Sequence, residues 1–225
     1  MSDILQRDTS LEMTAEFLRN NILNGVYKPG MQLKQSIIAS QLGVSQGPTR
    51  EALIQLEGEG LIEKVPYRGM FVRILREKDV EEIYQLRGAL EILAISICLE
   101  KLKKIENLDR LDKMYDEVIQ AERDSDFNRA VLADLGFHRF MVELSGNKRL
   151  LAIWDSLLAQ CRYLLRRLYE FQNKTQGISL AKNHDLILGA LRTGDFDQIS
   201  RVMLEHMDFA KVEFIKFISD NDLSH

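Results

Sequence analysis

The pattern of apolar residues over positions 33–60 predicts two short helices joined by a tight turn. The apolar positions that recur at helical spacing are Ile37, Ile38 and Leu42 in the first helix and Ala52, Leu53 and Leu56 in the second. Gly43 is placed to end the first helix in a left-handed conformation, and Ser45 is placed to cap the second. Gly60 marks the end of the second helix.

Two short runs typical of β-strands follow, at 61–65 and 70–72, with a turn between them from Pro66 to Gly69. Helix, turn, helix and hairpin in this order form a winged helix-turn-helix. The second helix of such a unit can lie in the major groove of DNA. A helical corner of this size also occurs in proteins that do not bind DNA, so the pattern alone leaves both interpretations open.

The chain after Asp79 contains no proline, and nearly every segment there has helical periodicity. A further helix is expected over 11–24, after a polar arm at 1–10. Six helices that cannot each bury an apolar face alone are expected to pack into a bundle whose core suits a ligand cavity. The fold class is therefore mainly α, with a winged helix-turn-helix and its small β-hairpin followed by an all-α helical bundle. The six expected helices span 80–99, 105–122, 127–144, 149–171, 180–192 and 197–218.

Composition places the chain among globular proteins of the cytoplasm. It has 225 residues, of which 45% are hydrophobic, enough for a substantial core. The longest apolar run, 92–99, is too short to span a membrane, and the N-terminus lacks the pattern of a signal peptide. Cys98 and Cys161 are far apart in helical segments, which is typical of buried thiols in a reducing compartment.

The charge divides unevenly along the chain. Residues 1–76 hold 9 Lys and Arg against 8 Asp and Glu, whereas residues 77–225 hold 21 against 26. The overall charge of −4 argues against indiscriminate coating of nucleic acid but not against a sequence-specific DNA-binding protein. We expect a domain boundary in the charged connection 73–78.

Three of the four histidines lie in the helical part, near a suitable carboxylate. Asp134 and His138 are four residues apart and share one helix face, while His184 and His206 lie on two other expected helices. Three imidazoles and a carboxylate suit zinc, nickel or manganese. From spacing alone, however, a single histidine on a helix is more often a core or surface residue than a metal ligand.

The N-terminal part resembles the DNA-binding domain of the GntR family of bacterial transcription regulators. The resemblance implies a DNA-binding domain over residues 1–76, with DNA contacts from the recognition helix and the wing. The matching stretches are 25–30, 42–45, 48–53, 56–61 and 68–72.

The DNA-contacting candidates follow from this resemblance. Arg50 matches an arginine of the recognition helix, and Arg68 and Gly69 match the tip of the wing. Many relatives have arginine where this chain has Gln46, which can contact adenine instead. We therefore expect either a different operator preference or weaker DNA binding. The remaining candidates, for phosphate contacts, are Lys34, Ser45 and Thr49.

The C-terminal part resembles the ligand-binding domain of the FadR subfamily, in its shorter six-helix variety. The matching residues include Tyr84 to Arg87, Leu90-Glu91, Asp134 to His138, Ser145 to Asn147, His184-Asp185, Gly194-Asp195 and His206. The resemblance implies that residues 77–225 form an effector-binding, metal-binding and dimerisation domain. It also implies that Asp134, His138, His184 and His206 hold a divalent metal ion.

An ion with open coordination positions can bind the carboxylate of a small organic acid. Arg87 is our first candidate for a second contact to that acid, with Arg162 as another. The alternative for Arg87 is an ion pair with Glu91, one helical turn away.

The sequence therefore predicts a homodimeric transcription regulator that binds a palindromic DNA operator under the control of a small carboxylate effector. One alternative is a metal sensor in which the ion itself is the signal. A metal-dependent hydrolase is a more remote alternative, because the sequence has no motif such as HExxH.

Overall fold

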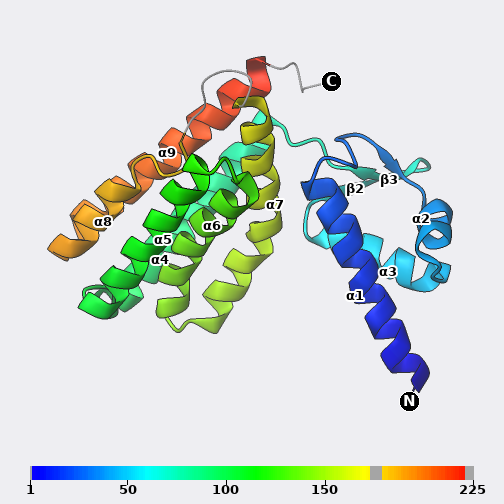
Figure 1. Cartoon of the computed structure of the whole chain (residues 1–225), viewed down its shortest axis with the longest axis horizontal. Coiled ribbons are helices and arrows are strands. Elements are labelled where there is room, and N and C mark those ends of the chain that lie inside the picture. Colours follow the sequence, from blue (N-terminus) through cyan, green and yellow to red (C-terminus); the bar gives the residue numbers. More distant parts are fainter. Residues whose placement is uncertain (1, 173–178, 221–225) are drawn as a thin grey trace. The chain divides into compact units, whose positions relative to one another are not determined.

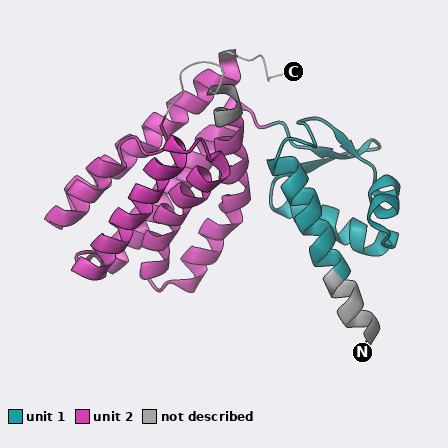
Figure 2. Ribbon diagram, in the orientation of Figure 1, with its two compact units in different colours: residues 1–74 teal, residues 75–225 magenta. Residues whose placement is uncertain are grey.

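The computed structural model describes residues 2–172 and 179–220 and divides the chain into two compact units (Figures 1 and 2). Unit 1 spans Met1–Ile74 and unit 2 spans Leu75–His225, so the division lies close to the position expected from sequence. The architecture is mainly α, with a small antiparallel sheet in unit 1 and a helical bundle in unit 2, as the sequence predicts. Among the described helices, none combines the length and apolar content of a membrane span.

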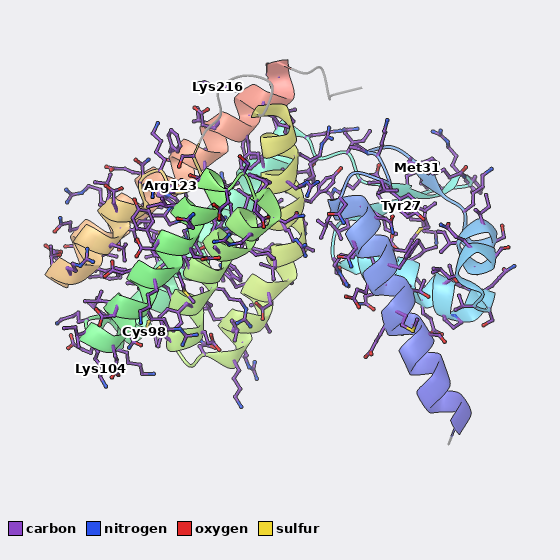
Figure 3. All side chains as sticks on the ribbon, in the orientation of Figure 1. Tyr27, Met31, Cys98, Lys104, Arg123 and Lys216 are labelled. Carbon is purple, nitrogen blue, oxygen red and sulfur yellow. The ribbon has the colours of Figure 1, made fainter. Side chains whose placement is uncertain are left out.

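The first helix of unit 1, α1, spans Ser2–Leu23. It begins well before the expected start at Leu11, so the prediction of a polar arm over the first ten residues is wrong. Apolar periodicity locates the packed part of a helix but does not limit how far the backbone continues beyond it. Tyr27, labelled in Figure 3, lies in the connection after α1, where its ring packs edge-on against Phe17 with 6.5 Å between centroids.

The helix-turn-helix consists of α2 (Gln35–Leu42) and α3 (Gln46–Gly58). Gly43 has a positive φ of 65°, and the N–H of Val44 donates to the carbonyl oxygen of Ala39 at 3.1 Å. This is the hydrogen bond that closes a helix ending in a left-handed glycine. Ser45 precedes α3 in an extended conformation, but its hydroxyl group makes no capping hydrogen bond.

The wing is a hairpin of β2 (Ile62–Val65) and β3 (Gly69–Val72), with Ile62 opposite Val72 and Val65 opposite Gly69. A further short strand, β1 (Gln32–Leu33), pairs antiparallel with the other edge of β3 and gives the order β1-β3-β2. The sequence analysis did not predict β1, because two residues are too few for strand periodicity to appear. Its pairing fixes the base of the wing to the segment before α2.

Unit 2 contains six described helices, close to the expected positions. Their bounds are α4 (Glu77–Leu102), α5 (Ile105–Arg123), α6 (Phe127–Leu144), α7 (Lys148–Gln172), α8 (His184–Thr193) and α9 (Phe196–Asp220).

The largest difference from the expected bounds is the start of α8, which we expected near Leu180. Asn183 has a left-handed conformation with φ of 71°, and a helix cannot continue through such a residue. The Glu122 carboxylate of α5 accepts hydrogen bonds from the backbone N–H groups of Leu180 and Ala181 and from the Ser179 hydroxyl group. These bonds hold the chain in a turn before α8 begins.

Helix α4 is central to unit 2, because it packs against α6, α7 and α9 (Figure 1). The Asp79 carboxylate near its N-terminus accepts a hydrogen bond from the N–H of Arg76 at 2.9 Å. The core around α4 includes the fully buried side chains of Ile95, Phe137, Trp154 and Phe214. Polar side chains in this core therefore lack contact with bulk water and need partners within the protein.

Candidate metal and effector site

Three helices of unit 2 bring the predicted metal ligands together. Asp134 and His138 lie on the buried face of α6, one turn apart. His184 is the first residue of α8, and His206 lies in the middle of α9. All four side chains are buried, with His138 and His184 fully inaccessible to solvent.

The distances among the three histidines suit a single ion, and Asp134 lies close to one of them. One ligand atom from each of His138, His184 and His206 lies within 4.8 Å of the others. Asp134 Oδ1 lies 3.2 Å from His184 Nε2. Two ligands of the same zinc ion, each about 2.0–2.2 Å from it, lie roughly 3–3.5 Å apart. The spacing of Asp134 and His184 therefore matches that of two ligands sharing an ion.

The hydrogen-bond pattern supports the same assignment. Four buried ring nitrogens of the cluster lack a hydrogen-bond partner among the described residues, namely His138 Nε2, His184 Nδ1, His184 Nε2 and His206 Nδ1. Buried polar atoms are nearly always paired, so several unpaired nitrogens in one place indicate a site for a further group. Imidazole nitrogens and a carboxylate are ligands that borderline divalent ions prefer.

The protonation states favour metal binding. Burial lowers the pKa of His138, and burial together with His184 and His138 lowers the pKa of His206 well below its usual value. Both rings are therefore neutral near pH 7, and a neutral imidazole offers a lone pair to a metal ion. Burial opposes ionisation of Asp134, but its contact with His184 brings the net pKa of its carboxyl group below the usual value.

Beside the cluster lies a second group of buried polar side chains centred on Glu91. Its Oε2 atom accepts a hydrogen bond from His138 Nδ1 at 2.6 Å. Its Oε1 atom accepts hydrogen bonds from Arg87 Nε at 3.2 Å and from Trp154 Nε1 at 3.1 Å. Burial alone would raise the pKa of Glu91, but its contact with His138, the charge of Arg87 and the hydrogen bond from Trp154 bring it to about 2. These contacts favour the ionised form of the buried Glu91 carboxyl group.

Asp134, His138 and His206 of the cluster and Arg87 of this polar group line one cavity of about 40 Å³. The Nη2 atom of Arg87 and the hydroxyl group of Tyr84 are buried without a hydrogen-bond partner among the described residues. The cavity is lined by residues that include Tyr84, Arg87, Asp134, His138, His206, Lys182, Phe209 and Phe214.

The two arginines proposed from sequence differ in position. Arg87 is 2% exposed and lines the cavity, and it also makes the ion pair with Glu91 that was its alternative role. Arg162 is partly buried on α7 and is not among the residues that line the cavity. The sequence analysis did not assign a role at the site to Tyr84, although it lies on the helix face of Arg87 at i−3, a spacing that signals proximity.

The DNA-facing candidates lie on two parts of unit 1. Lys34, Ser45, Gln46 and Arg50 are exposed around the N-termini of α2 and α3, and Arg68 and Gly69 are exposed at the tip of the wing.

Thr49 differs from the other candidates, because it is fully buried and its hydroxyl group donates to the carbonyl oxygen of Ser45 at 3.3 Å. The expectation that Thr49 reaches a phosphate is therefore not supported. Thr49 is instead one of the buried residues of α3.

These features define the class of winged-helix DNA-binding proteins that carry a second, all-helical domain with a ligand cavity. Comparison with known families agrees with this class. Residues 11–72 match the model of bacterial regulatory proteins of the gntR family, and residues 82–209 match the FCD domain. The chain belongs to the GntR family of bacterial transcription regulators, in the group with an FCD domain, and is not an enzyme. An FCD domain is consistent with the FadR subfamily.

Individual relatives agree with this assignment. The chain is 28% identical over 205 residues to the HTH-type transcriptional regulator LutR of Bacillus subtilis, covering 83% of this chain and 92% of the relative. It is 33% identical over 151 residues to the HTH-type regulator YdhC of the same organism, covering 65% and 67%. The fold is similar to that of Escherichia coli McbR/YncC, with a TM-score of 0.72, 23% identity and coverage of 92% and 97%.

Proposed function

We propose that this regulator binds a palindromic DNA operator as a homodimer, and that a small carboxylate bound beside a divalent metal ion in unit 2 controls its affinity for that operator. The observation that carries the proposal is the cavity itself. Nitrogens of three buried histidines and the Nη2 atom of Arg87, which have no hydrogen-bond partner among the residues that the structure describes, line or adjoin the same space. Such an arrangement favours an anion that meets a metal ion at one end and a guanidinium group at the other.

Asp134, His138, His184 and His206 would hold the ion. When bound, a zinc, nickel or manganese ion would supply an electropositive centre with room for a further oxygen ligand. Arg87 would bind and orient the effector by donating from Nη2 to a carboxylate oxygen, since Nε is already engaged by Glu91.

The cavity limits the size of the effector. A volume of about 40 Å³ is space for roughly three water-sized groups, at about 10–15 Å³ for each water. The effector is therefore an acid of few atoms, unless the cavity widens when it binds. The unpaired donors of Arg87 and Tyr84 also favour an acid over the ion alone as the signal, because a cation would leave both donors unpaired.

Homodimerisation is supported by an uncharged face of α4. Between positions 85 and 99 the only charged side chains are Arg87 and Glu91, and both are buried. Leu86, Leu93 and Ile97 lie on the opposite face of the helix, each about half exposed. Exposed apolar residues aligned along one helix mark an interaction surface, and the same surface on a second copy can pack against it about a two-fold axis.

The DNA interface we propose comprises the exposed N-terminal end of α3 and the tip of the wing. Gln46 and Arg50 would contact bases in the major groove. Lys34 and Ser45 would bind backbone phosphates, and Arg68 would contact the adjacent groove. Two such units in a symmetric dimer read the two halves of a palindrome, because the symmetry of the protein then matches that of the site.

The test starts from an operator selected by wild-type protein from a random duplex library. Operator affinity is then measured by fluorescence anisotropy for the metal-free protein, for zinc, nickel or manganese alone, and for each metal with acetate, succinate or citrate. The expected result is a change of about 5–150-fold that needs both metal and acid, equivalent to a coupling of about 1–3 kcal/mol. Acetamide and succinamide are the uncharged controls. An equal response to metal alone would favour the metal sensor, and no response to any combination would refute effector control.

A further inference from the structure

Within the core of unit 2, Glu91 contacts both a histidine of the metal cluster and Arg87, the residue proposed to bind the effector. It is fully buried on α4, and its two carboxylate oxygens contact different side chains. Oε2 faces His138 of α6, whereas Oε1 accepts from Arg87 of α4 and Trp154 of α7. A single carboxylate therefore contacts a candidate metal ligand, His138, and an arginine that lines the cavity, Arg87.

The contact with His138 decides which ring nitrogen carries the proton. A carboxylate can only accept, so its 2.6 Å contact with Nδ1 requires that Nδ1 carries the hydrogen. In a neutral ring the lone pair is then on Nε2, the nitrogen that has no hydrogen-bond partner among the described residues. The opposite tautomer would place a hydrogen on Nε2 and block metal binding there.

The contact with Arg87 decides which end of the guanidinium group faces the cavity. Glu91 Oε1 engages Nε, the atom nearest to the aliphatic stem, and Nη2 has no hydrogen-bond partner among the described residues. The Arg87 guanidinium group also lies 5.4 Å from the centroid of the Tyr84 ring, which limits its rotation. By binding Nε, Glu91 thus leaves Nη2 available to donate a hydrogen bond to an anion in the cavity.

We propose that Glu91 is the positioning residue of this site, setting the His138 tautomer for metal binding and fixing Arg87 for the effector. This inference rests on the proposed function for its metal and effector. Glu91 would not touch either of them and acts through His138 and Arg87. Groups that orient a metal-binding histidine in this way typically contribute 10–100-fold to metal affinity.

The test compares variants of Glu91 with a control variant that removes only the hydrogen bond from Trp154 to Glu91. Glu91→Gln keeps the shape of the side chain but loses its charge. The double variant Arg87→Met with Glu91→Met replaces the buried ion pair by apolar side chains of similar length, so no charge is left unpaired. Trp154→Phe removes one hydrogen bond to Oε1 but keeps the carboxylate and its contact with His138.

Two quantities are measured on the full chain. One is zinc affinity, by competition with a chromophoric chelator. The other is the protonation of the His138 ring nitrogens in metal-free protein, by ¹⁵N NMR. Wild type and Trp154→Phe are expected to bind zinc within about threefold of each other, with the hydrogen on Nδ1. The Glu91 variants are expected to lose at least tenfold in affinity, and the double variant to lose the preference for Nδ1.

The outcomes separate this inference from the proposed function. Zinc affinity and His138 tautomer unchanged in the folded double variant would overturn the role of Glu91, while the metal site would stand. If wild type bound no zinc, the proposed metal site would fail. The role of Glu91 in setting the tautomer would then still be decided by the NMR measurement, and an Nε2 hydrogen in wild type would overturn it.

Discussion

Binding of zinc at the histidine cluster is expected to raise the melting temperature of unit 2. A ligand that binds only the folded state stabilises it by RT ln(1 + [L]/Kd), which is about 2.7 kcal/mol at a hundred times Kd. Unit 2, Leu75–His225, has the size at which 1 kcal/mol shifts the melting temperature by about 2–4 °C. Removing the ion with a chelator should therefore lower the melting temperature of unit 2 by about 5–11 °C.

The chain provides its own reporter for this measurement. Trp154 is the single tryptophan and is buried in unit 2, so intrinsic fluorescence follows the unfolding of that unit. His184→Ala should abolish the difference between zinc and chelator, whatever its effect on the melting temperature of the metal-free protein. Asp185→Ala, which removes the exposed neighbouring carboxylate, should retain the difference. If the wild-type fluorescence transition occurred at the same temperature in zinc and in chelator, the cluster would not be a metal site.

Three further outcomes are expected. Leu93→Glu should convert a dimer to a monomer in analytical ultracentrifugation, because it places a charge on the uncharged face of α4, whereas Leu132→Glu on α6, at a similarly exposed leucine, should leave the dimer intact. Arg50→Ala should weaken binding to the selected operator by about 1–3 kcal/mol in anisotropy titrations, and unchanged affinity would exclude a base contact from Arg50. Gly43→Ala should destabilise unit 1 by about 1–2 kcal/mol in thermal melts followed by circular dichroism, because its positive φ is strained for alanine even though open space surrounds the new methyl group.

Helical periodicity predicted most of the fold, because the buried faces of the helices leave a regular signal in the sequence. The bounds of α6, Phe127–Leu144, were predicted to the residue. Its N-terminus is marked by Asp126, whose carboxylate accepts the N–H of Arg129 at 3.2 Å, and its C-terminus by the Ser145-Gly146 turn. Both signals are local in sequence, and local signals are the ones that a single sequence carries.

Features that depend on partners distant in the sequence were not predictable in the same way. The late start of α8 depends on Glu122, which lies on α5 far earlier in the chain. The burial of Thr49 depends on how α3 packs in unit 1, although its sequence position suggested a DNA contact. Local propensity cannot report such tertiary contacts, which override it.

The site illustrates the same division. The spacing of Arg87 and Glu91 suggested an ion pair within α4, and the structure contains that pair. The sequence presented the pair and effector binding as alternatives for Arg87. In the fold, Nε pairs with Glu91, while Nη2 has no hydrogen-bond partner in the described part of the chain and Arg87 lines the cavity, so the two roles are compatible. The contact between the Glu91 carboxylate and His138 forms only when α4 packs against α6.

Helix α4 combines the features through which a bound effector would act on the DNA-binding unit. It begins at Glu77, a few residues after the last strand of the wing, and so is joined to unit 1 by a short connection. Its inward face carries Arg87, and its opposite face carries the exposed leucines proposed to meet a second copy. An effector that binds Arg87 would act on the same helix that carries the proposed dimer contact. Control of operator affinity then requires only that α4 have two positions in the dimer and that the effector favour one of them.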